Sequence, residues 1–227
     1  MAKRYTGPYV SRGGEKLRGA LEAFNYSVAG KRVLDVGAST GGFTDCLLQC
    51  GATKVTALDV AYGQFAWKLR QDERVTVVER TNFKTADLLA LGAPFDLVVA
   101  DLSFIALSSL TNQFKIAVGE IGDLILLVKP QFEARREEVG EGGVIRDPQV
   151  HEAVLRRTGE AFAAAGLMPQ VWTHSPLTGP KGNIEFWLMV RGGAVLLSDV
   201  AQPLHSGGEC ASIESVVQAA HEMMGAS

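Results

Sequence analysis

The sequence of 227 residues predicts an α/β fold, with a mostly parallel seven-stranded sheet, helices on both faces and a final antiparallel hairpin strand. Short runs rich in Val, Leu and Ala alternate with segments of helical hydrophobic spacing, which is typical of α/β proteins. Several runs are apolar throughout rather than at every second residue, which indicates strands buried on both faces of a parallel sheet. The length fits one large domain.

The elements follow one another along the whole chain. Leu17, Leu21 and Phe24 recur at helical spacing within residues 13–27, so we expect a helix there after a basic, polar arm at residues 1–12. The expected strands are 32–36, 54–59, 75–79, 96–101, 123–129, 170–174 and 184–190. The other expected helices are 42–50, 63–70, 105–118, 149–165 and 212–224, the last capped by Ser212.

The last two expected strands are joined differently from the others. Residues 174–183 read HSPLTGPKGN, and their Gly and Pro content predicts a turn rather than a helix. A turn of this kind joins antiparallel neighbours, so a hairpin should complete the sheet. We therefore divide the chain into a basic arm and helix (1–27), a main α/β domain (28–191) and a C-terminal loop and helix packed on that domain (192–227).

Composition excludes several classes of protein. The net charge of −3 gives no overall cationic field to attract nucleic acid, so such binding would need local basic patches. Three cysteines make no disulfide framework, and Cys46 and Cys50 lack the His or Cys cluster of a metal site. Neither a signal peptide nor a run of about 18 apolar residues is present. We expect a reduced cytoplasmic protein without metal or membrane partner, either a monomer or a weak dimer.

A glycine-rich loop follows the first expected strand. Within residues 33–44, Gly37, Gly41 and Gly42 form a G-x-x-x-G-G pattern, which differs from the dinucleotide fingerprint and from the P-loop. No Lys follows to hold a phosphate, and Asp35 places a carboxylate beside the loop. A cationic or hydroxyl-bearing ligand suits this loop better than a pyrophosphate. A tight turn without a ligand is the competing interpretation.

Two polar residues extend this loop into a ligand site. Asp59 ends the second strand roughly 20 residues later, where an acidic side chain is placed to hold ribose hydroxyls. Asn82 follows the third strand and could contact an adenine ring, although a polar loop explains it equally well. Together they resemble the S-adenosylmethionine site of class I methyltransferases, which implies a Rossmann-like class I methyltransferase fold. The implied cofactor-binding residues are Asp35, Gly37, Ser39, Thr40, Gly41, Gly42, Phe43, Asp59, Asn82 and Asp101.

Four charged residues occupy positions where a charge is unusual. Asp101 and Lys129 end apolar strands, Glu185 lies inside the run NIEFWLMV, and Lys16 precedes the first strand. Two lysines and two carboxylates brought together suit chemistry on a hydroxyl group. A buried ion-pair network that only ties strand ends together is the competing interpretation. The catalytic one is favoured, because α/β proteins bind ligands at the carboxyl ends of their parallel strands.

The order of these charges resembles the Lys-Asp-Lys-Glu tetrad of FtsJ-type ribose 2'-O-methyltransferases. More narrowly, the chain resembles the TlyA (hemolysin-A-like) family of ribosomal RNA methyltransferases. The resemblance covers nearly the whole chain and rests on YVSRGGEKL (9–17), VLDVGASTGGFTDCLL (33–48), VVADLSFIAL (98–107), LVKPQFE (127–133), GGVIRDPQVHEAV (142–154) and SPLTGPKGNIEF (175–186). The stretches GGVIRDP and VKPQFE are hard to place in any other family.

The resemblance implies an S-adenosylmethionine-dependent enzyme that methylates the ribose 2'-hydroxyl of ribosomal RNA, free or in a ribosomal subunit, with cytidine as the expected nucleotide. Lys129 would be the general base that takes the hydroxyl proton, and Lys16 the neighbouring cation. Asp101 and Glu185 would orient the lysines and the target ribose.

RNA contacts are expected from local basic residues. Typical relatives carry a small S4-type RNA-binding domain before the stretch that matches residues 9–17, and only eight residues precede it here. The candidate phosphate ligands are Arg12, Lys16, Arg135 and Arg146, with solvated surface as the competing interpretation for the arginines. Phe104 and Phe132 are placed for a flipped base, with core packing as the alternative.

Three other functions compete with this one. A methyltransferase of a small hydroxylated metabolite would share the cofactor loop and the four charges. A membrane-active cytolysin is suggested by the family name, but the sequence contains no spanning segment and no strongly basic amphipathic helix. A non-enzymatic RNA-binding protein is disfavoured by the intact tetrad and glycine loop.

Overall fold

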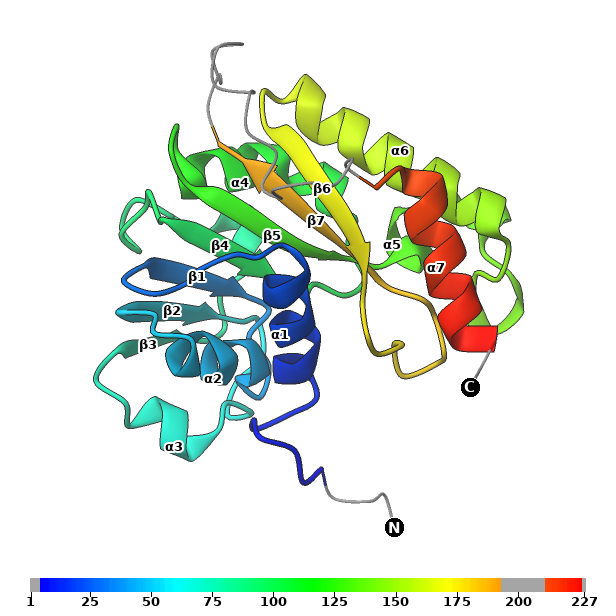
Figure 1. The fold of residues 1–227 in the computed structure, drawn as a ribbon. Helices are drawn as coiled ribbons and strands as arrows, with labels where there is room; N and C mark the ends of the chain where they lie inside the picture. The colour runs from blue at the N-terminus through cyan, green and yellow to red at the C-terminus, as the bar shows by residue number, and fades with distance from the viewer. Residues whose placement is uncertain (1–4, 193–210, 226–227) are drawn as a thin grey trace.

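The chain folds around one mixed sheet, as Figure 1 shows for the computed structural model, which describes residues 5–192 and 211–225. The strands lie in the order β3-β2-β1-β4-β5-β7-β6. Neighbours from β3 to β5 are parallel, whereas β7 is antiparallel to both β5 and β6, which confirms the predicted sheet. The strands are β1 (Arg32–Val36), β2 (Lys54–Leu58), β3 (Val75–Val78), β4 (Leu97–Ala100), β5 (Asp123–Val128), β6 (Met168–His174) and β7 (Phe186–Arg191).

Helices cover both faces of the sheet, because successive side chains along a strand point to opposite faces. Val33 and Val55 pack on the side of α1, α2 and α3, whereas Leu34 and Val98 pack on the side of α4, α6 and α7. The α-helices are α1 (Gly13–Ala23), α2 (Gly42–Gln49), α3 (Trp67–Arg70), α4 (Thr111–Val118), α5 (Pro130–Glu133), α6 (Pro148–Ala164) and α7 (Ile213–Gly225). Short 3₁₀ turns are η1 (Phe83–Thr85), η2 (Leu107–Leu110), η3 (Arg136–Glu138) and η4 (Glu141–Gly143).

Most of the sequence predictions for individual elements are confirmed. All seven predicted strands are present, and each end lies within two residues of its predicted place. Residues 175–185 connect the antiparallel strands β6 and β7 without a helix, as the turn signals predicted. Ser212 caps α7 by accepting a hydrogen bond from the backbone of Ser215 at 3.2 Å. Most of the predicted C-terminal loop, 193–210, lies outside the described residues.

Three predicted helices were wrong in extent. The first, expected within residues 13–27, ends at Ala23. Of the predicted helix 63–70 only α3 is helical, because the backbone of Gly63 donates to Glu79 and that of Ala66 donates to Thr40. The predicted helix 105–118 begins as the 3₁₀ turn η2 and becomes α-helical only at Thr111. Its first amides donate to the Glu133 carboxylate, a contact from a distant part of the sequence. The short helix α5 was not predicted.

The N-terminal segment crosses the start of α2 and fixes the position of α1. The backbone of Val10 donates to Asp45 at 2.9 Å, and Gln49 donates to the carbonyl of Pro8 at 3.2 Å. A Cβ on Gly42 would lie 2.2 Å from Ser11 Oγ, so the two segments touch where α2 begins. This crossing directs the first turns of α1 toward the carboxyl edge of the sheet.

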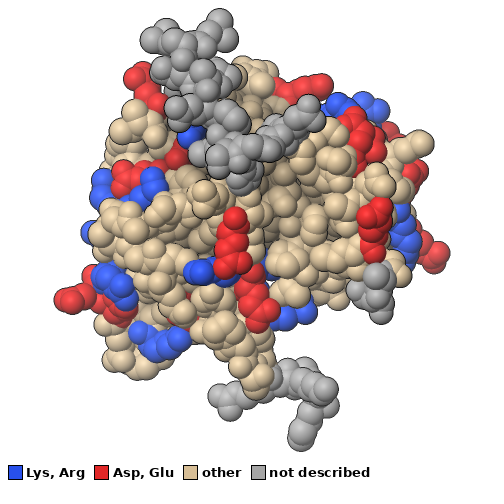
Figure 2. All heavy atoms as spheres, viewed as in Figure 1, with Lys and Arg blue, Asp and Glu red and all other residues tan. Residues whose placement is uncertain are grey.

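The surface shows no dominant charge on the face drawn in Figure 2, where basic and acidic side chains are interspersed. This mixture agrees with the small net charge of the chain. Among the residues that the structure describes, no helix combines the length and the apolar character needed to cross a membrane.

Candidate active site

The four charged residues singled out in the sequence form two ion pairs at the carboxyl edge of the sheet. Lys16 Nζ lies 2.5 Å from Glu185 Oε2, and both side chains are buried. Lys129 Nζ lies 2.5 Å from Asp101 Oδ1, but without the alignment of a hydrogen bond. Lys129 donates its hydrogen bond to Ser103 Oγ, at 3.0 Å.

The fold explains why residues so far apart in the sequence meet. Asp101 and Lys129 directly follow the parallel neighbours β4 and β5, so they leave the sheet at the same edge. Glu185 precedes the antiparallel strand β7, whose beginning lies at that edge, and Lys16 comes from α1. The two pairs differ in access, because Lys129 and Asp101 are 12% and 26% exposed while Glu185 is 1% exposed.

Glu185 sits in an environment that opposes its charge. Burial raises the pKa of Glu185 above its ordinary value, while the nearby Lys16 ammonium acts to lower it. Its other carboxylate oxygen faces Gly179, where a Cβ would lie 2.7 Å from Glu185 Oε1. A larger residue at position 179 would therefore displace either the turn or the carboxylate.

The glycine-rich loop closes against the end of β4. Gly37 has a φ of +83°, and a Cβ there would lie 2.4 Å from the backbone oxygen of Asp101. Gly41 has a φ of +94° at the residue before α2, a conformation that L side chains rarely adopt. The two glycines therefore let the loop pack closely against its neighbours, Gly37 against Asp101 and Gly41 against Leu69.

Asp35 lies beneath this loop with half of its carboxylate unpaired. Thr44 Oγ1 donates to Asp35 Oδ2 at 2.6 Å, whereas Oδ1 has no hydrogen-bond partner in the described part of the chain. Burial raises the pKa of Asp35 to about 7, and the hydrogen bond from Thr44 acts against that rise. A buried acceptor without a partner is unusual in a folded protein and suggests that a ligand completes it.

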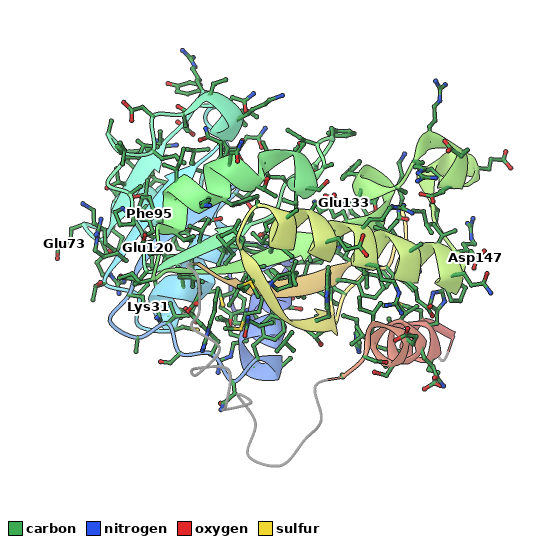
Figure 3. All side chains as sticks on the ribbon, turned by 90° about the horizontal axis from the view of Figure 1, so that it is seen from above. Lys31, Glu73, Phe95, Glu120, Glu133 and Asp147 are labelled. Carbon is green, nitrogen blue, oxygen red and sulfur yellow. The ribbon has the colours of Figure 1, made fainter. Side chains whose placement is uncertain are left out.

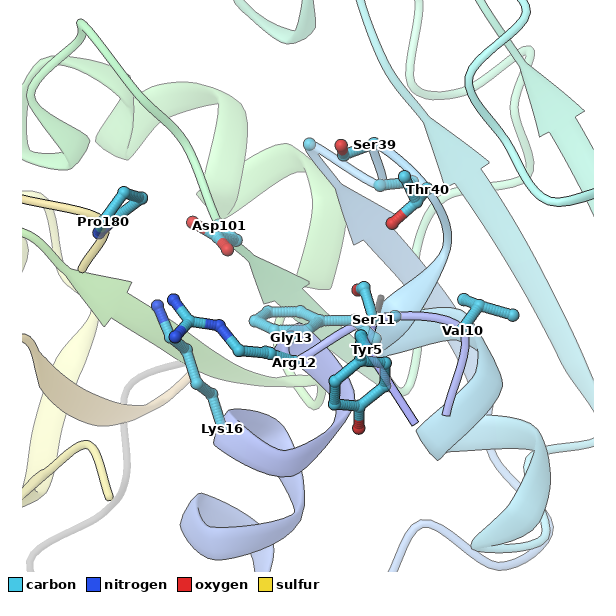
Figure 4. A pocket seen from close by; sticks show the side chains of 14 residues that line it. Tyr5, Val10, Ser11, Arg12, Gly13, Lys16, Ser39, Thr40, Asp101 and Pro180 are labelled. Atoms are coloured by element: carbon cyan, nitrogen blue, oxygen red, sulfur yellow. The ribbon is translucent and has the colours of Figure 1, made fainter. Parts of the chain in front are cut away.

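Two cavities lie on either side of the glycine loop and share Gly37, Ser39 and Asp101. The first cavity, of about 450 Å³, is shown in Figure 4 and is lined by Tyr5, Val10, Ser11, Arg12, Gly13, Lys16, Gly37, Ala38, Ser39, Thr40, Gly42, Phe43, Asp101 and Pro180. The second cavity, of about 440 Å³, is lined by Gly37, Ser39, Leu58, Asp59, Val60, Thr81, Asn82, Phe83, Lys84, Asp101, Leu102, Ser103, Phe104, Ile105 and Leu110.

Nearly all of the predicted cofactor residues surround these two cavities. Asp59 accepts hydrogen bonds from the backbone of Ser39 at 2.6 Å and of Ala61 at 2.7 Å, so it ties the glycine loop to the end of β2. Asn82 accepts from the backbone of Lys84 at 3.0 Å and caps η1. Asp35 and Gly41 line neither cavity and support the loop from below and from the start of α2.

A third cavity, of about 290 Å³, opens on the other side of the tetrad. Phe104 stands at its mouth, 91% exposed and with a φ of +65°, and its ring centroid lies 5.2 Å from that of Phe132. The lining consists of Ser103, Phe104, Lys129, Gln131, Phe132, Val139, Gly143, Gly179, Pro180, Lys181, Asn183 and Glu185. An exposed aromatic ring held in a strained backbone is unusual and points to a binding role.

Each ion pair joins the third cavity to a cavity beside the glycine loop. Lys16 lines the first cavity and its partner Glu185 lines the third. Asp101 lines the first and second cavities, and its partner Lys129 lines the third. The tetrad therefore lies between the two cavities at the glycine loop and the third cavity. A group would pass from one bound molecule to another at this place.

Several residues that the sequence did not single out hold this part of the site together. The Glu133 carboxylate (Figure 3) accepts hydrogen bonds from the backbone of Leu107, from the backbone of Ser108 at 3.4 Å and from Ser108 Oγ at 2.8 Å. It thereby connects α5, which follows Lys129, to the segment that follows Asp101. Its place inside the motif VKPQFE was the only signal in the sequence.

Asn183 makes a similar connection across the third cavity. It accepts from the backbone of Ile145 at 3.0 Å and donates to the carbonyl of Gly143 at 2.9 Å. The stretch 142–146 is thereby fixed to the turn that leads to Glu185. Sequence alone placed both stretches in family motifs without showing that they touch.

The predicted RNA-contacting arginines occupy two different settings. Arg12 lines the first cavity, and Figure 4 shows its side chain and that of Lys16 extending toward Asp101 and Pro180. Arg135 and Arg146 are exposed and line none of the three cavities. Within the described residues, no cluster of His, Cys, Asp and Glu could hold a metal ion.

Known proteins resemble this chain over most of its length. Residues 9–191 match the FtsJ-like methyltransferase family. The 16S/23S rRNA (cytidine-2'-O)-methyltransferase TlyA of Mycobacterium tuberculosis is 50% identical over 188 residues, which span 81% of this chain and 68% of that protein. Hemolysin A of Brachyspira hyodysenteriae is 44% identical over 182 residues, which span 78% of this chain and 75% of that protein.

Solved structures agree with this relationship. A protein from Streptococcus thermophilus described as a hemolysin has a TM-score of 0.88 and 38% identity, over 99% of this chain and 78% of that one. Fibrillarin of Aeropyrum pernix, solved with S-adenosyl-L-methionine, has a TM-score of 0.54 and 13% identity over 79% of this chain and 76% of that one, which shows a shared fold. The Rossmann-like methyltransferase fold predicted from the sequence is confirmed. The chain belongs to the FtsJ-like methyltransferase family and, within it, to the TlyA (hemolysin-A-like) family.

Proposed function

We propose that the protein methylates the ribose 2'-hydroxyl of a cytidine in ribosomal RNA, with S-adenosylmethionine as the methyl donor. One observation carries the proposal: the two Lys-carboxylate pairs stand between the cavities at the glycine loop and the third cavity. The names of the relatives support ribosomal RNA as substrate, since the tuberculosis protein is described as a cytidine-2'-O-methyltransferase.

The residues around the first two cavities fit S-adenosylmethionine. Gly37 brings the glycine loop close to Asp101 between the two cavities. The buried Asp35 beneath the loop carries an unpaired Oδ1, an acceptor suited to the ammonium of a methionine group. Asp59 is placed for the ribose and Asn82 for the adenine, both in the second cavity. The bound cofactor supplies an electrophilic methyl group on a sulfonium centre.

One residue of the tetrad would then accept the proton of the attacking hydroxyl. A general base must lie within hydrogen-bond reach of the proton that it takes. We assign this role to Lys129, because it faces the third cavity while its partner Asp101 faces the cofactor side. Asp101 and Ser103 would hold the Lys129 side chain in place.

The second pair positions the acceptor. Glu185 faces the third cavity and would accept a hydrogen bond from the target ribose, while Lys16 stays paired with it and offers its charge to a nearby phosphate. Alignment of oxygen, methyl carbon and sulfur would supply much of the rate enhancement.

RNA would approach over the rim of the third cavity. Phe104 and Phe132 offer aromatic faces on which a base turned out of its helix can stack. Arg12 and Lys16 extend from the first cavity, and Arg135 and Arg146 lie exposed, where each can meet a phosphate.

Transfer of tritium from labelled S-adenosylmethionine tests the proposal directly. Ribosomal subunits, bare ribosomal RNA and small hydroxylated metabolites should be offered separately to the purified protein. We expect label in ribosomal RNA, lost with Lys129→Ala and kept with Lys115→Ala, whose lysine donates to the carbonyl of Ala165 far from the tetrad. Label in small acceptors but not in RNA would refute the RNA assignment.

A further inference from the structure

One side chain of the third cavity carries a polar atom that no described residue satisfies. The carbonyl oxygen Oε1 of Gln131 is buried without a hydrogen-bond partner. Buried polar atoms of folded proteins are nearly always bonded, and an unpaired acceptor costs free energy until a donor reaches it. The position therefore suits a ligand that brings an N–H group.

The place of Gln131 in the fold indicates which part of a ligand it would meet. It follows Lys129 by two residues, in the single turn of α5, and lines the third cavity with Lys129 and Glu185. The rings of Phe104 and Phe132 line the same cavity, so a flat aromatic group has both a face to stack on and an amide within the same space. A nucleobase has this combination of a flat face and a polar edge.

Resting on the proposed function, we propose that Gln131 recognises the base of the nucleotide whose ribose is methylated, by accepting a hydrogen bond from an exocyclic amine. A glutamine amide pairs with two adjacent base atoms, as it does with adenine in DNA recognition. Cytosine presents its N4 amine beside the N3 acceptor, which match Oε1 and the amide NH₂ of Gln131. With the amide in this orientation, uracil, which presents a carbonyl in place of the amine, would leave Oε1 facing another oxygen.

The other polar groups of the cavity favour the same base. The cationic donors are already engaged, because Lys129 contacts Asp101 and Ser103 while Lys181 donates to the carbonyl of Gly142 at 3.5 Å. Glu185 adds a second acceptor to the lining. A base edge with an amine therefore finds acceptors, whereas a base edge with a carbonyl in that place finds few unengaged donors.

The test compares two RNAs that differ at one base. The methylated position is first mapped, and ribosomal RNA transcripts are then made with cytidine or uridine at that position. We expect the wild-type protein to methylate the cytidine transcript faster by roughly 5- to 150-fold in single turnovers, the range of one good side-chain–base pair. Gln131→Leu should lose most of that preference through a slower reaction with cytidine. Gln131→Glu keeps an acceptor and should retain part of it.

Controls separate recognition from folding and from the proposed function. Gln149→Leu changes an exposed glutamine of α6 outside the three cavities and should behave as wild type. The affinity of Gln131→Leu for S-adenosylmethionine should equal that of wild type. An unchanged cytidine preference in Gln131→Leu would overturn the inference and leave the proposed function standing. Failure of the wild-type protein to label any ribosomal RNA would overturn the proposed function itself.

Discussion

Asp101 and Lys129 leave the sheet from the neighbouring strands β4 and β5, and their side chains meet with 2.5 Å between Oδ1 and Nζ. Asp101 faces the two cavities at the glycine loop, and Lys129 faces the third cavity. The contact places a potential base beside the end of the cofactor site without burying it completely. This contact is the basis for proposing Lys129 as the general base that takes the proton of the ribose hydroxyl.

Removal of the Lys129 amine should abolish methyl transfer while leaving the cofactor site intact. Lys129→Ala is expected to slow single-turnover transfer by about 10²- to 10⁴-fold, the usual contribution of a general base. Affinity for S-adenosylmethionine, measured by calorimetry, should change little, because Lys129 lines neither of the first two cavities. Substantial activity of Lys129→Ala at neutral pH would remove it from this role.

Loss of the Asp59 carboxylate should weaken cofactor binding. Asp59 fixes the glycine loop through the backbone of Ser39 and is also placed for the cofactor ribose. Hydrogen bonds to charged groups contribute about 1.5–3 kcal/mol, so Asp59→Ala should raise the dissociation constant by about 10- to 100-fold. Asp87→Ala, at an aspartate that accepts from the backbone of Ala90, is the matched control. Equal affinity of Asp59→Ala and wild type in calorimetry would refute the ribose assignment.

Cofactor affinity should fall as the pH drops below about 7. Burial raises the pKa of Asp35 to about 7, so the carboxyl gains a proton near neutrality and can no longer pair with a cationic ammonium. Calorimetry between pH 5 and pH 8 should show this dependence in wild type. Asp35→Asn should bind weakly and without the step near pH 7, and a wild-type affinity that is flat across this range would contradict the assignment.

The same group makes a prediction about the stability of the protein without cofactor. Because the folded-state pKa of Asp35 lies above its unfolded value of 3.8, the folded state binds the extra proton between these values. Protonation of Asp35 therefore stabilises the folded protein fully below pH 3.8. This stabilisation is lost as the pH rises toward 7, at about 1.4 kcal/mol per pKa unit. The free energy of unfolding, measured with denaturant, should fall more steeply with rising pH across this range in wild type than in Asp35→Asn. Parallel curves would show that Asp35 keeps an ordinary pKa.

RNA binding should depend steeply on salt and on three arginines. Each phosphate contact contributes a slope of roughly 0.7–0.9 in log K against log salt. Replacement of Arg12, Arg135 and Arg146 together by Ala should therefore flatten the slope by about 2–3 units without changing cofactor affinity. The control replaces three other exposed arginines, Arg18, Arg74 and Arg156. An unchanged slope in filter binding would mean that RNA docks elsewhere.

The fold could be predicted well from sequence because its strands are apolar and its connections carry clear turn signals. The ends of the strands were predicted to within two residues, because strands buried on both faces are apolar throughout and stand out in the sequence. The start of α4 could not be predicted, because the Glu133 carboxylate binds the first amides of η2 from a distant part of the chain. The predicted helix at 63–70 was wrong for a similar reason, a tertiary hydrogen bond from Gly63 to Glu79.

The candidate site was predictable in its residues but not in its arrangement. The tetrad could be named from charges at strand ends, but the sequence could not show that Lys16 pairs with Glu185 and Lys129 with Asp101. The unpaired oxygen of Gln131 depends on packing around a single turn of helix, which no sequence pattern encodes.

A map of ribose methylation in the ribosomal RNA of the source organism tests the proposed methyl transfer to cytidine. The map should compare the intact strain, a strain without the gene, and that strain restored with wild type or with Lys129→Ala. We expect a 2'-O-methylcytidine that is absent without the gene, returns with wild type and does not return with Lys129→Ala. Identical ribose methylation in the intact and deleted strains would contradict it.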